Sequence, residues 1–201
     1  MVARQQQLVR CDFEAFPAEE VLKRHLGLFN ELLSETNALV LSDYGKGGLS
    51  HIADMIESAR AKNLPILVDP KGDDYSRYRG ATVITPNRAE LRQVVGSWSS
   101  EAALIERAQN LRRELNLSYL LLTRSEEGMT LFGPEGEFNV PAQAREVFDV
   151  SGAGDTVIAI LAAMLATGMP IEDAVRIANR AGGIVVGKLG TAAVSYEELF
   201  A

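Results

Sequence analysis

Residues 149–155 read Asp-Val-Ser-Gly-Ala-Gly-Asp and stand directly before the most apolar predicted helix of the chain, Thr156–Thr167. Glycines at 152 and 154 allow a sharp backbone turn and leave amide N–H groups uncovered. A helix that begins there directs its unpaired N–H groups and the positive end of its dipole toward one point. The stretch therefore predicts an anion site, for which a phosphate group is the natural ligand.

Asp155 stands at the mouth of this predicted anion site. A carboxylate repels a phosphate, so its presence there is explained if it accepts the proton of a hydroxyl group that attacks the phosphorus. The structural alternative is a glycine turn followed by an acidic residue that stabilises the first helical turn through the dipole. The surrounding sequence is needed to choose between these two interpretations.

Short apolar runs alternate with helical patterns through the first two thirds of the chain. The runs are 38–42, 65–69, 81–85 and 119–123. Apolar strands that alternate with helices are typical of a parallel sheet covered on both faces. We therefore predict one α/β domain, a doubly wound and mainly parallel sheet flanked by helices. Helices are expected at 19–33, 50–62, 100–114, 156–167 and 171–188 and from residue 87 onward, with a β-hairpin at 129–140.

Polar residues follow the end of every one of these apolar runs. Ligands of open α/β sheets bind at the carboxyl ends of the strands, so these residues are expected to converge near the start of the helix after Asp155. In chain order they are Asp43 and Lys46, Asp69 and Lys71, Asn87 and Glu90, and finally Thr123, Ser125 and Gly128. Their convergence is the strongest evidence in the residues themselves for a ligand site.

The pair Asn87 and Glu90 has two interpretations. Its spacing is that of a capping box, which would only start a helix. Alternatively, Glu90 supports a magnesium ion through water and Asn87 contacts a phosphate, because magnesium keeps several waters and needs few protein carboxylates. Both interpretations can hold at once.

The other clusters also keep a structural alternative. Residues 69–71 form either a turn with a solvated lysine or a source of positive charge for a phosphate. Asp43 and Lys46 lie in a loop that either enters a helix or binds ligand. Residues 123–128 form either an ordinary strand exit or a set of hydroxyl and N–H groups that hold a nucleotide.

Composition excludes several classes of protein. A net charge of −7 argues against nucleic acid or an anionic membrane as partner, because no basic surface is available to hold phosphates. The single cysteine, Cys11, excludes an internal disulfide, is expected to be a buried thiol and fits a reducing cytoplasm. The longest apolar run, within 157–165, is too short to span a bilayer. No Cys/His spacing suits zinc, and neither a nucleophile-elbow nor a P-loop motif occurs.

Together these motifs resemble those of the ribokinase-like (PfkB) family of carbohydrate kinases, over essentially all 201 residues. Residues 149–155, combined with Asn87-x-x-Glu90, are specific to that family. Other strings resemble a narrower group, the kinases that phosphorylate a heptose 7-phosphate in lipopolysaccharide synthesis. These strings are Leu41-Ser-Asp-Tyr-Gly-Lys-Gly, Val68-Asp-Pro-Lys-Gly, Thr82-Val-Ile-Thr-Pro-Asn, Leu122-Thr-Arg-Ser-Glu-Glu-Gly-Met and Val186-Gly-Lys-Leu-Gly-Thr.

The resemblance implies transfer of the γ-phosphoryl group of ATP to the anomeric hydroxyl of the sugar phosphate, with ATP and Mg²⁺ as cofactors. Asp155 is implied as catalytic base, with the amides of Gly152, Ala153 and Gly154 as the anion hole. Nucleotide, phosphate and magnesium binding is implied for Asn87, Glu90, Lys71, Thr123, Ser125, Gly128 and Asn179. Substrate binding is implied for Arg4, Gln6, Asp43 and Lys46, and a possible K⁺ site for Asp149 and Ser151 near the 190–195 loop.

Two features of the family are absent from the sequence: a Gly-Gly-x-x-Asn motif that binds sugar hydroxyls, and the first part of the sheet with its small β lid. The chain is therefore expected to be the C-terminal portion of a longer kinase domain. Residues 1–16 would contain a strand, 4–14, returning from the lid, and 17–201 would form the α/β core. The lid of many relatives forms homodimers. The alternatives are a nucleotide-binding fragment without kinase activity, or a kinase for another sugar or nucleoside.

Overall fold

The main feature of the fold is a six-stranded sheet whose strands lie in sequence order. The computed structural model describes residues 2–3, 6–7, 11, 13–143 and 147–200. The strands are β3 (Leu39–Ser42), β4 (Ile66–Asp69), β5 (Val83–Ile84), β6 (Tyr119–Thr123), β7 (Met129–Gly133) and β8 (Gly136–Val140). β3 to β6 are parallel, and β7 and β8 continue as an antiparallel hairpin. The predicted, mainly parallel sheet is confirmed.

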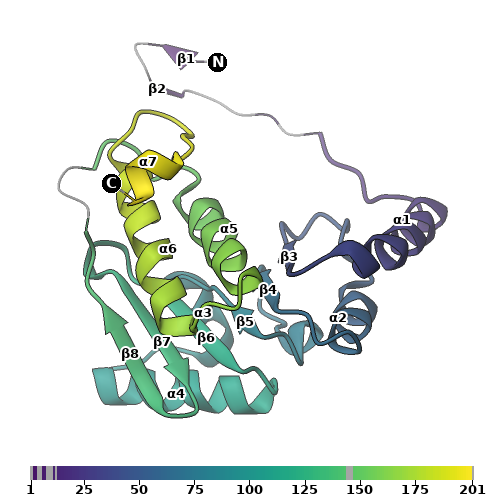
Figure 1. Ribbon diagram of the computed structural model, residues 1–201, viewed down its shortest axis with the longest axis horizontal. Coiled ribbons are helices and arrows are strands. Elements are labelled where there is room, and N and C mark those ends of the chain that lie inside the picture. The colour runs from purple at the N-terminus through teal and green to yellow at the C-terminus, as the bar shows by residue number, and fades with distance from the viewer. Residues whose placement is uncertain (1, 4–5, 8–10, 12, 144–146, 201) are drawn as a thin grey trace.

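Helices cover both faces of this sheet (Figure 1). On one face lie α2 (Ile52–Arg60), α3 (Arg88–Val95) and α4 (Glu101–Glu114), and on the other α5 (Ala153–Ala166) and α6 (Ile171–Val186). The two remaining helices are α1 (Glu19–Leu32), which contacts α2, and α7 (Tyr196–Phe200), which contacts α6. The predicted doubly wound arrangement is therefore present.

The central strands β4, β5 and β6 are mainly apolar because each face of the sheet has its own core. Successive side chains of a strand point to opposite faces. In β4, Leu67 packs in the core under α5 and α6, while its neighbours Ile66 and Val68 pack in the core under α2, α3 and α4. All three side chains are almost completely buried. A continuous apolar run is therefore what this sheet requires.

Some boundaries and exposures differ from the predictions. α5 begins at Ala153 rather than at Thr156, which places Asp155 inside its first turn. The single strand predicted for 4–14 is wrong for the described residues 11, 13 and 14, which have no regular structure, and two-residue strands β1 (Val2–Ala3) and β2 (Gln6–Gln7) pair with each other instead. Cys11 is exposed because this segment lies outside both cores, so its predicted burial is wrong. None of the described helices has the length and hydropathy needed to cross a membrane.

Candidate active site

The start of α5 is built by the glycine turn that the sequence predicts. Gly152 caps the helix with φ 79°, in the left-handed region that side chains disfavour. The N–H of Thr156 donates to the carbonyl oxygen of Gly152, so helical bonding begins there and the amides of the preceding first turn have no carbonyl partner within the helix. One predicted donor is engaged elsewhere, because the N–H of Ala153 donates to the carbonyl oxygen of Val150 at 3.2 Å.

A polar cavity of about 210 Å³ lies at this helix start. The loops that follow β3, β4, β5 and β6 all contribute to its wall, together with the first turn of α5. Its polar side chains are those of Tyr44, Asp69, Thr85, Asn87, Glu90, Thr123 and Asp155. The carboxyl ends of the strands thus meet the glycine turn in space, which is the arrangement that the sequence predicts.

Negative charge is concentrated in this cavity. Among the described residues, Asp69, Glu90 and Asp155 place carboxylates in its wall. Burial raises the pKa of Asp69 to about 6, and the negative charges of Glu90 and Asp155 act in the same direction. The ammonium of Lys71, which lies 3.1 Å from Glu90 Oε1, offsets only part of this repulsion. In the sequence Asp69 belongs to a polar cluster after an apolar run, and its place in this cavity is not evident from that pattern.

Asn87 and Glu90 form a complete capping box at the start of α3. The Asn87 side chain accepts hydrogen bonds from the N–H groups of Ala89 and Glu90, at 2.9 and 3.0 Å. Glu90 Oε2 accepts the N–H of Asn87 at 3.0 Å, and its Oε1 faces Lys71. The structural interpretation is therefore confirmed, and both residues also line the cavity.

A mostly apolar groove of about 410 Å³ adjoins the polar cavity, and Thr123, Gly154 and Val157 belong to both. The residues implied for nucleotide binding, Thr123, Ser125, Gly128 and Asn179, all line this groove. Its apolar wall includes Met129, Val147, Val150, Val157 and Val186. The volume and the mostly apolar lining of the groove are typical of small-molecule sites.

Two features fix the loop that follows β6. Gly128 has φ 94°, and a Cβ there would lie 2.1 Å from the carbonyl oxygen of Val140, so only glycine fits. Arg124 pairs with Glu101 of α4 and with Glu127 of the same loop, and also donates to Thr130 Oγ1 at 3.1 Å. Hydrogen bonding to Glu101 raises the pKa of Arg124 against the effect of burial. The sequence analysis did not identify this arginine, because its partner on α4 is distant in the chain.

Several residues implied for the substrate do not line the cavity. The Asp43 side chain is buried; its Oδ1 accepts the N–H of Gly45 and its Oδ2 accepts the hydroxyl of Tyr78, each at 2.8 Å. Lys46 Nζ lies 2.6 Å from Glu14 Oε1. Arg4 lies outside the described residues, and Gln6 is described only as part of β2. Substrate contact by any of these residues stays a prediction.

Asp149 contacts both Ser151 and the 190–195 loop, the latter through the backbone of Gly190. Asp149 Oδ1 accepts the N–H of Ser151 at 2.9 Å. Hydrogen bonds from Ser151, and then from the backbone of Gly190, lower the pKa of Asp149. The carboxylate is therefore held ionised by N–H donors, and a K⁺ ion at this place stays a prediction.

Comparison with known proteins gives the class to which this fold and site belong. A model of the pfkB family of carbohydrate kinases matches residues 13–198. The chain therefore belongs to the PfkB carbohydrate kinase family.

The chain is similar along its length to curated members of that family. It is 55% identical over 199 residues to the D-beta-D-heptose 7-phosphate kinase of Bordetella bronchiseptica, covering 99% of this chain and 64% of the relative. It is 54% identical over 204 residues to the bifunctional protein HldE of Hahella chejuensis, covering 99% of this chain and 42% of the relative. The chain thus spans less than two thirds of the length of these relatives.

Solved structures share the fold at low sequence identity. Phosphofructokinase-2 from Escherichia coli, in complex with potassium, matches with a TM-score of 0.77 and 19% identity, over 92% of this chain and 61% of that one. Ribokinase from Arabidopsis thaliana, complexed with ribose and ATP, matches with a TM-score of 0.70 and 19% identity, over 87% of this chain and 55% of that one. The predicted ribokinase-like fold is confirmed.

Proposed function

We propose that this chain contains the nucleotide site and catalytic base of an ATP-dependent sugar kinase. The observation that supports it most directly is the position of Asp155, a carboxylate in the first turn of α5, beside main-chain donors and next to an apolar groove. The proposed reaction moves the γ-phosphoryl group of ATP to the anomeric hydroxyl of D-glycero-D-manno-heptose 7-phosphate.

The heptose assignment depends on the relatives. The Bordetella bronchiseptica relative, 55% identical to this chain, is named a D-beta-D-heptose 7-phosphate kinase. We infer the same substrate here, and with it a role in ADP-heptose supply for the lipopolysaccharide core. Cytoplasmic location and a homodimer belong to the same proposal, as does the absence of nucleic-acid and membrane partners, which agrees with the net charge of −7.

In the proposed mechanism the chain mainly positions and stabilises, as phosphoryl transfer requires. The apolar groove holds the base of the nucleotide, so that its phosphates reach the start of α5. The amides of Gly152 and Gly154 face charge on the transferred group. The attacking sugar oxygen bonds to the γ-phosphorus as the bond from that phosphorus to the bridging oxygen breaks, and this oxygen leaves with ADP. Asp155 takes the proton of the attacking hydroxyl, a contribution of ~10²–10⁴-fold in rate.

The donor set fits a magnesium ion. Asp69 and Glu90 bring carboxylate oxygens to the cavity. The pKa of Asp69 is raised first by burial and then by the negative charges of Glu90 and Asp155, and a cation would offset that negative charge. Within the described residues no group of three or more His, Cys, Asp or Glu side chains could hold a metal by itself. An ion that keeps most of its waters agrees with that sparse set. When bound, magnesium would neutralise phosphate charge, and Glu90 and Asp69 would hold it through water.

The test is a coupled assay of ADP release with heptose 7-phosphate and a panel of other sugars and nucleosides. It uses the 201-residue chain and, in parallel, a chain extended to the length of the Bordetella bronchiseptica relative. We expect turnover with heptose 7-phosphate and less than a hundredth of it with fructose 6-phosphate, ribose or adenosine. A clear preference for another acceptor would refute the heptose assignment while leaving the kinase assignment intact.

A second candidate function is nucleotide binding without catalysis. The observation in its favour is that the chain spans 64% of the heptose 7-phosphate kinase relative. ATP binding by calorimetry together with no ADP release from the 201-residue chain would support it. Turnover by that chain, comparable with that of the longer one, would exclude it.

A further inference from the structure

The hydroxyl of Tyr44 lies 3.3 Å from Asp155 Oδ1, across the polar cavity. Tyr44 belongs to the loop after β3, while Asp155 belongs to α5, so this contact joins two distant parts of the chain. The tyrosine side chain lines the cavity, and 61% of the residue is exposed. A large aromatic residue with that exposure contributes little to the core, and its placement needs another explanation.

The buried side chain of Asp43 holds in place the loop that contains Tyr44. That buried carboxylate accepts hydrogen bonds from the Gly45 N–H and the Tyr78 hydroxyl, and the Arg77 guanidinium lies 3.5 Å away. The N–H of Asp43 donates to the carbonyl oxygen of Asp69 at 3.0 Å, which ties the loop to the end of β4. Asp43 thus builds the support from which the Tyr44 ring extends over the cavity.

Gly45 completes this geometry. Its φ of 69° lies in the left-handed region, which turns the chain back immediately after Tyr44. A Cβ at this glycine would lie 3.7 Å from Lys71 Cγ, in ordinary contact, so the requirement is conformational rather than steric. In the sequence Asp43-Tyr44-Gly45, Asp43 is buried and holds the loop, Tyr44 faces the cavity, and Gly45 reverses the direction of the chain.

We propose that Tyr44 is a positioning residue for the catalytic base: its hydroxyl donates to Asp155 Oδ1 and leaves Oδ2 to accept the proton of the substrate hydroxyl. This inference rests on the proposed function, in which Asp155 is that base. A base works only when the accepting oxygen is within hydrogen-bond reach of the proton, so a fixed carboxylate orientation has a direct effect on rate.

The charges around Asp155 make such a donor useful. Asp69 and Asp155 repel each other, and the ammonium of Lys71 is paired with Glu90. The Tyr44 hydroxyl is the side-chain donor to Asp155 observed among the described residues. Its 3.3 Å separation is longer than an ordinary O–H···O bond, as is common for catalytic hydrogen bonds before substrate excludes water. The contact is expected to shorten in the ternary complex.

The first experiment is steady-state kinetics of Tyr44→Phe in the longer chain described above, which keeps the ring and removes the hydroxyl. We expect kcat to fall about tenfold, with KM for ATP and for the sugar phosphate within twofold of wild type. Tyr196→Phe is the matched control, because Tyr196 is also exposed but packs against Phe200 away from the cavity. A rise in KM for the sugar at unchanged kcat would show a substrate contact instead and overturn the proposal.

A double-mutant cycle tests whether the hydroxyl acts through Asp155. Because the two side chains are proposed to act as one unit, Tyr44→Phe should cause no further loss of residual turnover in an Asp155→Asn background. A tenfold loss in both backgrounds would contradict a role through Asp155.

A measurement independent of turnover separates this proposal from the function on which it rests. In protein labelled with ¹³C at aspartate carboxyl groups, the Asp155 signal is assigned by its loss from the carboxylate region in Asp155→Asn. Tyr44→Phe should move that signal, and Tyr196→Phe should leave it in place. An unmoved signal would overturn the positioning role. A moved signal in a protein that phosphorylates no sugar would instead show that the contact exists and the kinase assignment fails.

Discussion

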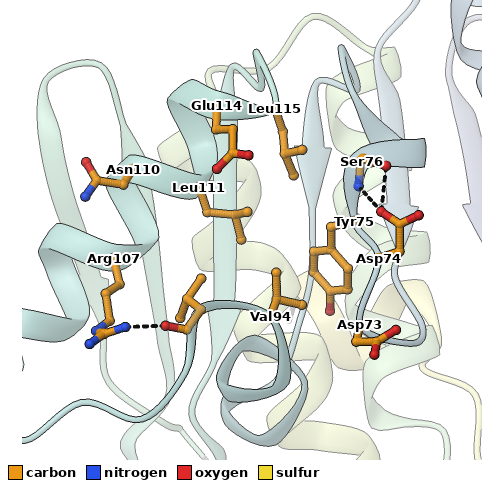
Figure 2. A pocket seen from close by; sticks show the side chains of 11 residues that line it. Asp73, Asp74, Tyr75, Ser76, Val94, Arg107, Asn110, Leu111, Glu114 and Leu115 are labelled. Atoms are coloured by element: carbon orange, nitrogen blue, oxygen red, sulfur yellow. Dashed lines mark hydrogen bonds between the residues drawn. The ribbon is translucent and has the colours of Figure 1, made fainter.

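Two cavities of this molecule differ in the hydrogen-bond partners and neighbouring charges of the carboxylates that line them. The cavity at the start of α5 has about 210 Å³ and brings carboxylates together. The cavity in Figure 2 is larger, about 360 Å³, and lies between α4, the end of α3 and the short 3₁₀ helix η2 (Ser76–Tyr78). There Asp74 Oδ1 accepts both the N–H and the hydroxyl of Ser76, and Arg107 donates to the carbonyl oxygen of Val95.

The two carboxyl groups respond in opposite directions. Hydrogen bonds from Ser76 lower the pKa of Asp74, whereas burial and neighbouring carboxylates raise the pKa of Asp69 to about 6. In the Figure 2 cavity Asp74 has its hydrogen-bond partner on the neighbouring Ser76, whereas in the cavity at α5 Asp69 faces the negative charges of Glu90 and Asp155. This concentration of like charge, rather than cavity volume, is the reason for proposing the cavity at α5 as the active site.

The largest expected effect comes from Asp155→Asn. Loss of the general base should lower kcat by ~10²–10⁴-fold, because asparagine cannot accept the proton, while the affinity for ATP changes less than threefold. The measurement is ADP release, with nucleotide binding by calorimetry. Turnover near that of wild type would contradict the proposal that the cavity at α5 is the active site, because that proposal requires Asp155 to be the base.

Gly128→Ala should act on the apolar groove that adjoins the polar cavity at the start of α5. A Cβ at Gly128 would lie 2.1 Å from the carbonyl oxygen of Val140, at φ 94°, so the loop after β6 must move. We expect a loss of ~2–4 kcal/mol in the free energy of unfolding and weaker ATP binding. Chemical denaturation and calorimetry measure the two effects.

Gly136→Ala is the matched control for this clash. Gly136 also has a positive φ, 123°, but a Cβ there would meet nothing within 4 Å. It should cost only the conformational strain, ~1–2 kcal/mol, and leave ATP affinity unchanged. Equal losses for the two variants would show that strain alone decides, and that the contact with Val140 contributes nothing.

Asp69→Asn should stabilise the metal-free protein above pH 6. The folded-state pKa of Asp69, about 6, lies above its ordinary value of 3.8, so the folded state binds the proton more tightly. The contribution of this carboxyl to stability therefore falls as the pH rises from about 4 to about 6. Asparagine removes the unfavourable charge, worth about 1 kcal/mol after solvent screening, or ~2–4 °C in melting temperature.

The measurement is thermal unfolding with EDTA at pH 4.5 and pH 8. The variant should gain stability at pH 8 and little at pH 4.5, where folded wild type already carries the proton. Magnesium and ATP should favour the wild type, because the carboxylate then has a counter-charge. A gain that is the same at both pH values would contradict the raised pKa.

The smallest expected effect is that of Asp74→Asn in the Figure 2 cavity. Its carboxylate bonds to Ser76 at the surface, so kcat and both KM values should stay within twofold of wild type. The kinetic measurement is the same as for Asp155→Asn, and the two variants form a matched pair. A large loss of turnover in Asp74→Asn would show that a carboxylate with a local hydrogen-bond partner can still have a functional role.

Much of the fold follows from the sequence because the central strands β4 to β6 are mainly apolar on both faces and the strands of the sheet lie in chain order. Helix starts are less predictable. The start of α5 at Ala153 depends on the left-handed conformation of Gly152, which permits a first turn made of Ala153, Gly154 and Asp155. The short strands β1 and β2 lack a periodic pattern long enough to be recognised.

The candidate site is predictable where spacing determines geometry. Asn87 and Glu90 sit three residues apart on one helical turn, and their capping contacts follow from that spacing alone. The loop after β3 was harder, since the sequence does not show which of Asp43 and Tyr44 faces the cavity. Tyr78 and Arg77 decide which of the two side chains is buried. Their contacts with Asp43 satisfy its buried carboxylate, so that Tyr44 is the side chain that faces the cavity.

Sheet order and helix order have a consequence for synthesis. α5 packs on β3 and β4, and α6 packs on β7 and β8, although both helices follow all of these strands in the chain. On the ribosome, every strand of the sheet therefore emerges before the segment that brings Asp155 to it. Until α5 and α6 arrive, one apolar face of the nascent sheet stays uncovered, at the stage where chaperones engage new chains. The polar cavity at the start of α5 can therefore form only after residues 153–166 have been translated.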